Sequence, residues 1–270
     1  MARNPLWLTT AVEAVVRAGE VMAARLGTDV RVDKKGAIDL VTEVDLAIER
    51  EFRALVAGRF PDHGVLGEEL DDAASAHTPP DGPCWVFDPI DGTTNFTHGL
   101  PIFCASLALE IDGIAEVAAV YDPTRQELFT AERGGGAYLN GRPIRVSSAD
   151  GLIDSLLVTG FPYDVHSRIQ EIVGLFAAFV GRARAVRRLG SAAIDLCYVA
   201  AGRMDGFWER DLKPWDIAAG GLLVSEAGGR ITGFGGTPFQ SRQRDVVASN
   251  GRIHDEMLQV IAGPRPVVSL

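Results

Sequence analysis

The amino-acid sequence predicts a mixed α+β N-terminal half that packs on an α/β C-terminal half. In the first half, two helical patterns precede a group of strands joined by hairpin turns. After about residue 148, short apolar strands alternate with helical patterns, which is the order found in α/β folds. We therefore expect one subdomain over residues 1–148 and a second over residues 149–270. A chain of 270 residues is long enough to bury a core between two such parts.

The first half is predicted to begin with two helices. Apolar residues recur at helical spacing over residues 8–26 with charged residues between them, which indicates an amphipathic surface helix and not a signal peptide. A polar stretch over residues 28–39 separates this helix from a second one over residues 42–57. A turn at residues 58–64 and a short strand at residues 65–67 follow. Residues 71–83, which include three prolines, are expected to form a polar loop.

Strands dominate the rest of the first half. Residues 84–87 are predicted to form a buried strand that ends at Asp88. The alternation over residues 103–121 and 126–131 predicts antiparallel strands, with a hairpin turn at Asp112 and Gly113. Glycines 134–136 and the Asn-Gly pair at 140–141 mark a further hairpin.

The second half alternates between the two kinds of element. The predicted strands lie at residues 156–160, 184–189, 206–209, 230–232 and 245–248. The predicted helices lie at residues 167–181, 191–201 and 215–227. Residues 264–270 are expected to be a short tail.

Composition limits the classes of function. The formal net charge of −10 repels nucleic-acid phosphates and anionic lipids, so we expect neither a nucleic-acid nor a membrane partner. No run of about 18 apolar residues is present, so no transmembrane span is predicted. Three widely spaced cysteines form no disulfide framework and favour the reducing cytoplasm.

Acidic residues recur where predicted strands end or predicted helices begin. Asp88 and Asp91 bracket a Pro-Ile dipeptide at the end of an apolar strand, where a tight turn could bring both carboxylates and the Ile90 carbonyl around one or two cations. Gly92 and the threonines after it supply N–H groups and hydroxyls where a helix could start, a favourable place for a phosphate. The other acidic residues in such positions are Glu68, Glu69, Asp45 and Asp216.

Each acidic element also has an ordinary structural interpretation. A D-P-x-D-G run is usually a turn, and a glutamate pair is usually a solvated strand end. An aspartate near a helix start, such as Asp45 or Asp216, favours the helix dipole without any further role. The combination of all four elements is what favours a metal site, because Mg²⁺ prefers oxygen ligands of this kind.

Two motifs stand out in the sequence, DPIDGTTNF at residues 88–96 and WDIAAG at residues 215–220. They resemble the first and the second signature of the inositol monophosphatase family of magnesium-dependent, lithium-sensitive phosphatases. Residues 67–69 and 39–45 match two further segments in the right order, and the resemblance extends from the first helix to residue 250. It implies a layered α-β-α-β-α sandwich of the sugar phosphatase type, and hydrolysis of a phosphate monoester by metal-activated water.

The resemblance also implies roles for individual residues around two Mg²⁺ ions, with a weaker third ion near Glu68 in some members. The implied metal ligands are Glu68, Asp88, the Ile90 carbonyl, Asp91 and Asp216. The implied catalytic residues are Glu68, Thr93 and Asp45, with Asp45 orienting Thr93. The implied substrate contacts are Asp91, Gly92, Thr93, Ala192, Glu209 and Asp216. Glu69 and one lysine, either Lys34 or Lys35, would support these groups without binding metal.

The alcohol part of the substrate depends on the second half. Glu209 matches the carboxylate that binds a ring hydroxyl in inositol monophosphatases, so the favoured substrate is myo-inositol monophosphate or another small phosphorylated polyol. Glu209 could instead pair with Arg210 or Lys213. Residues 160–163 (GFPY) resemble bacterial members at a loop that faces the substrate.

Several alternatives stay open. On the same scaffold the enzyme could hydrolyse histidinol phosphate or fructose bisphosphate. A different class is a regulatory protein-binding partner in RNA processing or transcription, although the complete carboxylate set favours catalysis. The resemblance implies a homodimer. Arg187 and Arg188 could contact substrate or a partner subunit, but an arginine pair at a strand end is more often solvated.

Overall fold

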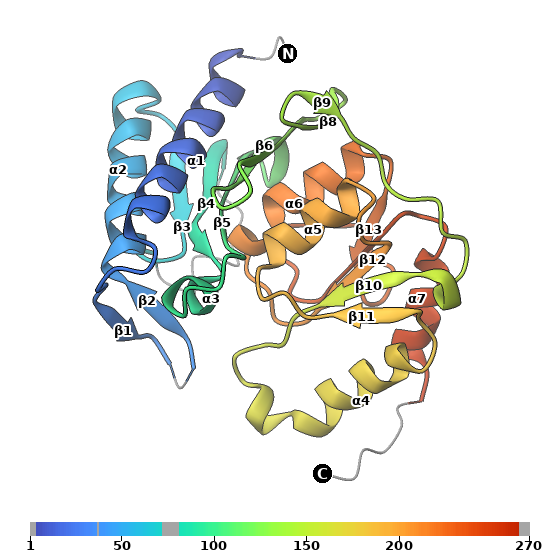
Figure 1. The fold of residues 1–270 in the computed structure, drawn as a ribbon. Helices are drawn as coiled ribbons and strands as arrows, with labels where there is room; N and C mark the ends of the chain where they lie inside the picture. Colours follow the sequence, from blue (N-terminus) through green and yellow to red (C-terminus); the bar gives the residue numbers. More distant parts are fainter. Residues whose placement is uncertain (1–3, 37, 72–80, 265–270) are drawn as a thin grey trace.

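Two β-sheets and the helices around them form alternating layers in the computed structural model, which describes residues 4–36, 38–71 and 81–264 (Figure 1). Helices α1 (Leu6–Arg25) and α2 (Glu43–Arg59) cover one face of a seven-stranded sheet. Helices α5 (Ala192–Ala200) and α6 (Pro214–Glu226) lie between this sheet and a five-stranded sheet. Helices α4 (Ile169–Val180) and α7 (His254–Ala262) cover the outer face of the second sheet. The order is α-β-α-β-α, so the predicted layered fold is confirmed.

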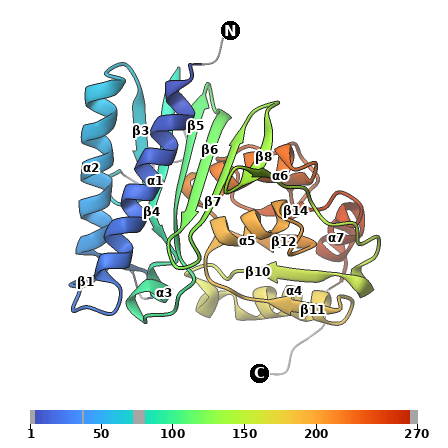
Figure 2. The same cartoon turned by 45° about the horizontal axis from the view of Figure 1, so that its top comes forward.

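The first sheet is antiparallel except at one edge, where β3 and β4 run parallel (Figure 2). Its strands in spatial order are β3 (Gly64–Gly67), β4 (Pro83–Asp91), β5 (Cys104–Ile111), β6 (Ile114–Asp122), β7 (Glu127–Glu132), β8 (Gly136–Leu139) and β9 (Arg142–Pro143). The predicted hairpin joins β5 to β6. Asp112 and Gly113 in its turn have φ values of 52° and 77°, which Asp and Gly tolerate better than most residues.

The second sheet is mixed. Its strands in spatial order are β11 (Ala185–Arg187), β10 (Leu156–Thr159), β12 (Gly206–Glu209), β14 (Val246–Ser249) and β13 (Arg230–Gly233). Strand β10 pairs in parallel with β11 and β12, whereas β14 is antiparallel to both of its neighbours. Short helical turns are α3 (Thr93–Thr97), η2 (Leu152–Asp154) and η3 (Val165–Ser167).

Two parts of the chain were not predicted from the sequence, and one predicted loop can be compared only in part. The polar stretch contains β1 (Val32–Lys34), which pairs with β2 (Leu40–Thr42). Every residue of β1 is exposed, so the strand has no apolar alternation from which it could be predicted. Helix α7 was not predicted, because its first turn is polar and the helix is short. Most of the predicted loop at 71–83 lies outside the described residues.

The apolar core joins the two halves of the chain. One cluster of buried residues around α5 and α6 includes Val86 and Val120 from the first sheet, and Val158 and Val246 from the second. The proposed boundary at residue 148 falls between β9 and β10, where the chain forms neither helix nor strand. The division into subdomains stays a prediction, because the halves share this core. Within the described residues, every helix is too short or too polar to cross a lipid bilayer.

Candidate active site

The N-terminus of α2 determines the position of Asp45. Thr42 caps the helix, since its Oγ1 accepts the N–H of Val44 at 3.1 Å, and Asp45 Oδ2 accepts the N–H of Thr42 at 2.9 Å. The other carboxylate oxygen, Oδ1, lies 3.4 Å from Thr93 Oγ1. Burial raises the pKa of Asp45 to about 6. One carboxylate therefore caps its own helix and also contacts the threonine predicted to be catalytic.

The end of β4 brings Asp88 and Asp91 to one edge of the first sheet. The pairing of β4 with β5 shifts register between these two residues, at the point where Pro89 removes a backbone donor. Asp88 Oδ1 accepts the N–H of Ile90 at 3.0 Å, and the Ile90 carbonyl accepts the Thr93 hydroxyl at 2.9 Å. The structure thus gathers both aspartates, the Ile90 carbonyl and Thr93 within one turn.

Gly92 makes the turn into α3 possible. Its φ is +98°, and a Cβ at this position would lie 3.0 Å from the Ile102 carbonyl oxygen. Any other residue would have a strained backbone at this φ, and its Cβ would lie too close to the carbonyl oxygen. Gly92 is the N-cap of α3 and Thr93 is its first residue, where N–H groups have no acceptor within the helix. These amides are therefore available to an anion beside Thr93.

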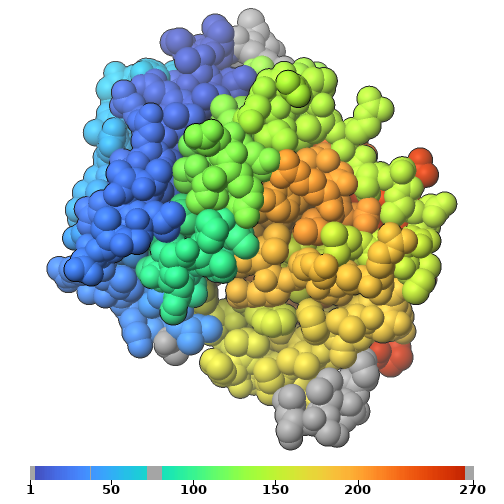
Figure 3. Space-filling view, viewed as in Figure 1, coloured from blue at the N-terminus to red at the C-terminus, as the bar shows by residue number. Residues whose placement is uncertain are grey.

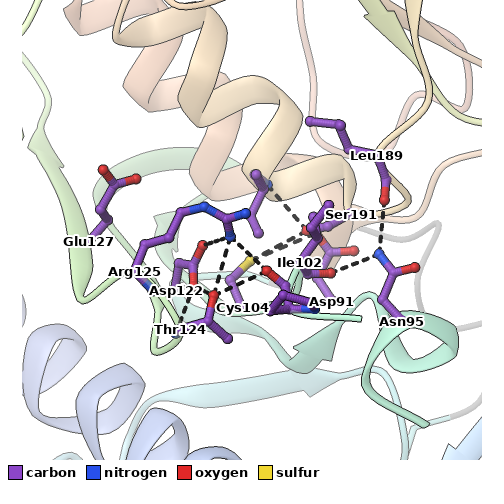
Figure 4. A network of polar contacts seen from close by, with 12 residues as sticks. Asp91, Asn95, Ile102, Cys104, Asp122, Thr124, Arg125, Glu127, Leu189 and Ser191 are labelled. Carbon is purple, nitrogen blue, oxygen red and sulfur yellow. Dashed lines mark hydrogen bonds and ion pairs between the residues drawn. The ribbon is translucent and has the colours of Figure 1, made fainter. Parts of the chain in front are cut away.

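Asp91 connects the two halves of the molecule (Figure 4). Its Oδ2 accepts a hydrogen bond from Ser191 Oγ at 2.7 Å and from the N–H of Ala193 at 2.6 Å, both at the N-terminus of α5. Burial raises the pKa of Asp91 to about 6, although these two donors favour its charged form. Ala192, a predicted substrate contact, is the first residue of α5 and is buried at the same place.

Two residues at this junction had no predicted role. Ser191 caps α5 as well as binding Asp91, and its position before an apolar helical pattern was the signal that could have identified it. Asn95 lies in α3, and its Nδ2 donates to the Ile102 carbonyl at 2.8 Å and to the Leu189 carbonyl at 2.9 Å (Figure 4). Asn95 therefore ties the turn after β4 to the segment that leads into α5.

Lys35 contacts both glutamates that follow β3. Its Nζ lies 2.6 Å from Glu68 Oε1 and 3.0 Å from Glu69 Oε1, and the lysine side chain is 26% exposed. Burial disfavours the charge of Lys35, but the two carboxylates outweigh this effect and raise its pKa. Burial and the charge of Glu68 raise the pKa of Glu69 to about 8. Lys34 is exposed at the end of β1, so the structure brings Lys35 to this site.

Replacing the two lysines separately tests this placement. Lys35→Gln should lower kcat roughly tenfold or more, because the charged hydrogen bonds that hold Glu68 and Glu69 are worth about 1.5–3 kcal/mol each. Lys34→Gln is the matched control and should keep kcat within about twofold, since an exposed lysine contributes little. Steady-state phosphate release measures both variants. An equal loss in the two would contradict the placement of Lys35.

Asp216 adds a carboxylate from the second half. It lies in the first turn of α6, where its Oδ2 accepts the N–H of Lys213 at 2.7 Å. Burial, and then the charges of Glu68 and Asp91, raise the pKa of Asp216 well above its ordinary value. Burial and the charges of Glu68, Asp91 and Asp216 raise the pKa of Asp88 in the same way. These carboxylates are thus close enough to oppose one another's ionisation.

This donor set fits a hard divalent cation. Asp88 and Asp216 each use one oxygen for a backbone N–H, and the other oxygen of each has no hydrogen-bond donor in the described part of the chain. Crowded carboxylates that resist ionisation are stabilised by a cation between them. Among the described residues, no group of three His, Cys, Asp or Glu side chains is already arranged around one cation position. The positive charge beside Glu68 comes from Lys35. The residues that would hold a metal are Glu68, Asp88, Asp91 and Asp216, with the Ile90 carbonyl.

Glu209 lies at the end of β12, against Gly160 in the segment that follows β10. A Cβ at Gly160 would lie 2.1 Å from Glu209 Oε1, so only a glycine leaves room for this carboxyl group. Burial raises the pKa of Glu209 to about 8, while Arg188 acts in the opposite direction. A small depression adjoins the same residues and extends along Phe161 and Pro162.

The arginines near Glu209 have other partners. Arg210 Nη1 lies 3.0 Å from Glu171 and 3.2 Å from Asp245, and within the described residues Glu209 forms no ion pair with Arg210 or Lys213. The alternative in which Glu209 merely pairs with one of these cations is therefore wrong. Arg187 and Arg188 are both exposed, and the Arg188 guanidinium carbon lies 5.9 Å from the centre of the Phe161 ring.

The site lies where both halves of the molecule contribute residues. Figure 3 shows a small hollow where the β1–β2 hairpin, α3 and the segment after β10 come together. Crowded carboxylates from both halves, beside a threonine and free helix amides, suit the binding of cations and a phosphate. This fold and this site define a metal-dependent phosphatase.

The chain belongs to the inositol monophosphatase family, whose sequence model matches residues 5–263. An inositol-1-monophosphatase of Synechocystis sp. is 44% identical over 257 residues, which cover 95% of this chain and 88% of that protein. The Nus factor SuhB of Salmonella typhimurium is 44% identical over 254 residues, which cover 93% of this chain and 94% of SuhB. The solved structure of Thermotoga maritima IMPase has a TM-score of 0.85 and 36% identity, and the match covers 94% of this chain and 96% of that one.

Membership of this family confirms three predictions from the sequence. The resemblance was correct, the protein is a phosphoric monoester hydrolase, and its fold is that of inositol monophosphatases. Enzymes of the family are metal-dependent and act on phosphorylated substrates.

Proposed function

We propose that the protein hydrolyses myo-inositol monophosphate to inositol and phosphate with Mg²⁺, as a homodimer in the cytoplasm. The observation that carries the choice of substrate is Glu209, a half-buried carboxyl group that lies against Gly160 and whose pKa is raised to about 8 by burial. At this place it exchanges hydrogen bonds with the hydroxyls of a neutral polyol and offers no positive charge to a second phosphate. The similarity to an inositol-1-monophosphatase supports the same substrate.

Two Mg²⁺ ions are proposed, with a weaker third near Glu68. Glu68, Asp88 and the Ile90 carbonyl would hold the first ion, and Asp88, Asp91 and Asp216 would hold the second. When bound, the ions supply a water of lowered pKa and stabilise charge on the leaving ester oxygen. Lithium is expected to inhibit by competing for the second of these positions. Three free, buried cysteines agree with a reducing compartment.

The side chains orient the attacking water and the phosphate. The Thr93 hydroxyl donates its proton to the Ile90 carbonyl or to Asp45, so its oxygen can accept a hydrogen bond from the water. Glu68 Oε2, the oxygen that Lys35 does not contact, takes a proton from the water. The amides of Gly92 and Thr93 bind phosphate oxygens. The water oxygen bonds to phosphorus as the ester P–O bond breaks, and the alcohol oxygen takes a proton from solvent.

A kinetic panel tests the proposed substrate. We expect kcat/KM with Mg²⁺ to be higher for inositol-1-phosphate than for histidinol phosphate, fructose-1,6-bisphosphate or glycerol-2-phosphate. A higher value for histidinol phosphate or fructose-1,6-bisphosphate would replace the proposed substrate with that compound. Full activity in high lithium would contradict the proposed competition, and analytical ultracentrifugation tests the dimer.

Truncating Glu209 should change KM more for inositol-1-phosphate than for glycerol-2-phosphate. In Glu209→Ala we expect KM for inositol-1-phosphate to rise about tenfold, since hydrogen bonds to a carboxyl group contribute about 1–3 kcal/mol. KM for glycerol-2-phosphate, which has no ring, should change less than about twofold. Glu171→Ala is the matched control, because Glu171 pairs with Arg210 at the surface nearby. Equal changes for both substrates would argue against contact between Glu209 and the ring.

A second function as a protein partner in transcription or RNA processing has one supporting observation, the similarity to a Nus factor. The net charge of −10 disfavours direct contact with RNA but permits contact with protein. Co-purification of transcription proteins with both the wild type and an inactive variant would support this function independently of catalysis. Failure of both to retain such proteins would exclude it.

A further inference from the structure

One face of α2 carries three charged residues at intervals of four, Asp45, Glu49 and Arg53. Residues spaced in this way lie one above the other on a helix. Asp45 contacts Thr93, as described above. Glu49 and Arg53 contact the segment 67–71, which carries Glu68 and Glu69. A single helix face therefore reaches two separate parts of the active site.

Glu49 binds the backbone directly after Glu68. Its side chain is 0% exposed. Its Oε2 accepts the N–H of Glu69 at 2.8 Å, and its Oε1 lies 3.3 Å from the N–H of Leu70. Arg53 compensates the buried charge, because its Nε and Nη2 donate to Oε1 at 3.0 and 2.8 Å. Both oxygens of this carboxylate are thus used to hold the turn that carries Glu68.

Gly67 and Asp71 complete the network at the two ends of the turn. Asp71 Oδ2 accepts the N–H of Gly67 at 2.7 Å and also a hydrogen bond from Arg53. A Cβ at Gly67 would lie 2.2 Å from Glu49 Oε1, so the backbone of β3 approaches Glu49 as closely as only glycine allows. Residues 67–71 are therefore anchored before and after Glu68.

We propose that Glu49 is a positioning residue, which together with Arg53 holds the turn 67–71 so that Glu68 stays at its cation-binding place. A buried ion pair contributes little net stability compared with apolar packing. The buried charge of Glu49 is therefore explained by the position that it gives to the turn 67–71, and not by a gain in stability. This role rests on the proposed metal-dependent hydrolysis and extends it to a residue that touches neither the metal nor the substrate.

Magnesium binding tests the role of Glu49. Glu49→Gln keeps the length of the side chain, but a neutral amide cannot accept from both backbone N–H groups and also compensate Arg53. We expect Mg²⁺ binding, measured by isothermal titration calorimetry without substrate, to weaken at least about tenfold, with KM for substrate nearly unchanged. Glu51→Gln on the same helix is the control, because Glu51 is an exposed partner of Arg17. Unchanged Mg²⁺ affinity in a folded Glu49→Gln protein would overturn the proposal.

Gly67→Ala provides a second approach if Glu49→Gln is unstable. The added Cβ must displace the Glu49 carboxylate, so Mg²⁺ binding should weaken by a similar factor. In the double variant the loss should be smaller than the product of the single losses, because both changes break the same contact. Independent, multiplicative losses would overturn the proposal. If the wild type binds Mg²⁺ and Glu49→Gln does not, but inositol monophosphate is not hydrolysed, the substrate proposal fails while the role of Glu49 stands.

Discussion

Asp91→Asn is expected to lower magnesium-dependent phosphate release from inositol-1-phosphate about a thousandfold or more, while the protein stays folded. The asparagine carbonyl oxygen can still accept the hydrogen bonds from Ser191 and Ala193, so the junction between the two halves is preserved. What is lost is the negative charge at the place where the second cation is proposed. The same charge opposes ionisation of Asp88 and Asp216.

Because the charge of Asp91 attracts the proposed cation but repels the neighbouring carboxylates, stability is a useful second measurement for Asp91→Asn. Without metal, removing one of several crowded carboxylates should leave the thermal midpoint unchanged or raise it by a few degrees. The increase in midpoint on adding Mg²⁺ should become much smaller than in the wild type. Circular dichroism melts with and without Mg²⁺ measure both effects. Asp112→Asn in the β5–β6 turn is the matched control, since asparagine also tolerates positive φ. Unchanged turnover in Asp91→Asn would refute the metal assignment.

The metal-free protein is expected to lose stability as the pH rises from about 5 to 8, and Mg²⁺ should remove this loss. Burial and mutual repulsion raise the pKa values of Asp88 and Asp216, and burial raises those of Asp91 and Glu69 to about 6 and about 8. In this range the folded state therefore holds more protons than the unfolded state. Stability then falls as the pH rises. A bound cation replaces those protons and cancels the effect.

The size of the magnesium effect can be estimated by mass action. At a Mg²⁺ concentration of about 100 Kd, binding adds about 2.7 kcal/mol, which corresponds to roughly 5–10 °C in Tm for a chain of this size. Because cation binding must displace fewer protons at high pH, the rise in Tm should be larger at pH 8 than at pH 6. Thermal melts of chelator-treated protein, with and without Mg²⁺, measure this difference. An equal or larger rise at pH 6 would contradict the carboxylate cluster.

His254 gives the stability measured in the same melts the opposite dependence on pH. It is buried between Thr232 and Ser249, and burial lowers its pKa to about 4. The unfolded state gains a proton at this histidine below about pH 6.5 while the folded state does not, so its contribution to stability is lost as the pH falls from about 6.5 to 4. The histidine lies away from the proposed cation site, and its effect is the same with and without Mg²⁺. The difference between the two melting curves therefore isolates the carboxylates.

Local sequence signals predicted the elements that local interactions stabilise. The sequence predicted a helix over residues 42–57 with Asp45 near its start, and α2 begins at Glu43, directly after the Thr42 cap. The hairpin at Asp112 has the dipeptide that such turns require. Strand β1 carried no such signal, because all its side chains face solvent and only pairing with β2 defines it. Helix α7 was missed because its apolar residues gain stability mainly by packing on the second sheet.

Within the site, the sequence could predict the groups that lie close to one another along the chain. Asp88, Ile90 and Asp91 could be predicted together because one short turn brings them together. Lys34 and Lys35 could not be distinguished, since neighbouring residues near a strand point in different directions and only the pairing of β1 decides which one reaches Glu68. Glu49 looked like an ordinary charged residue of an amphipathic helix, and only packing against β3 shows that it is buried.

By itself, the sequence determined the family, because the acidic segments that carry its chemistry are short runs, and the resemblance to that family implied the layered fold and the class of reaction. Only the tertiary structure decided how the two halves complete one site. Asp91 and Ser191 are 100 residues apart in the chain but are joined by a hydrogen bond of 2.7 Å. Such a contact depends on how α5 packs against the first sheet, and no local pattern records it. The same kind of packing places Glu209 against Gly160 and gives Arg210 the partners Glu171 and Asp245 instead of Glu209.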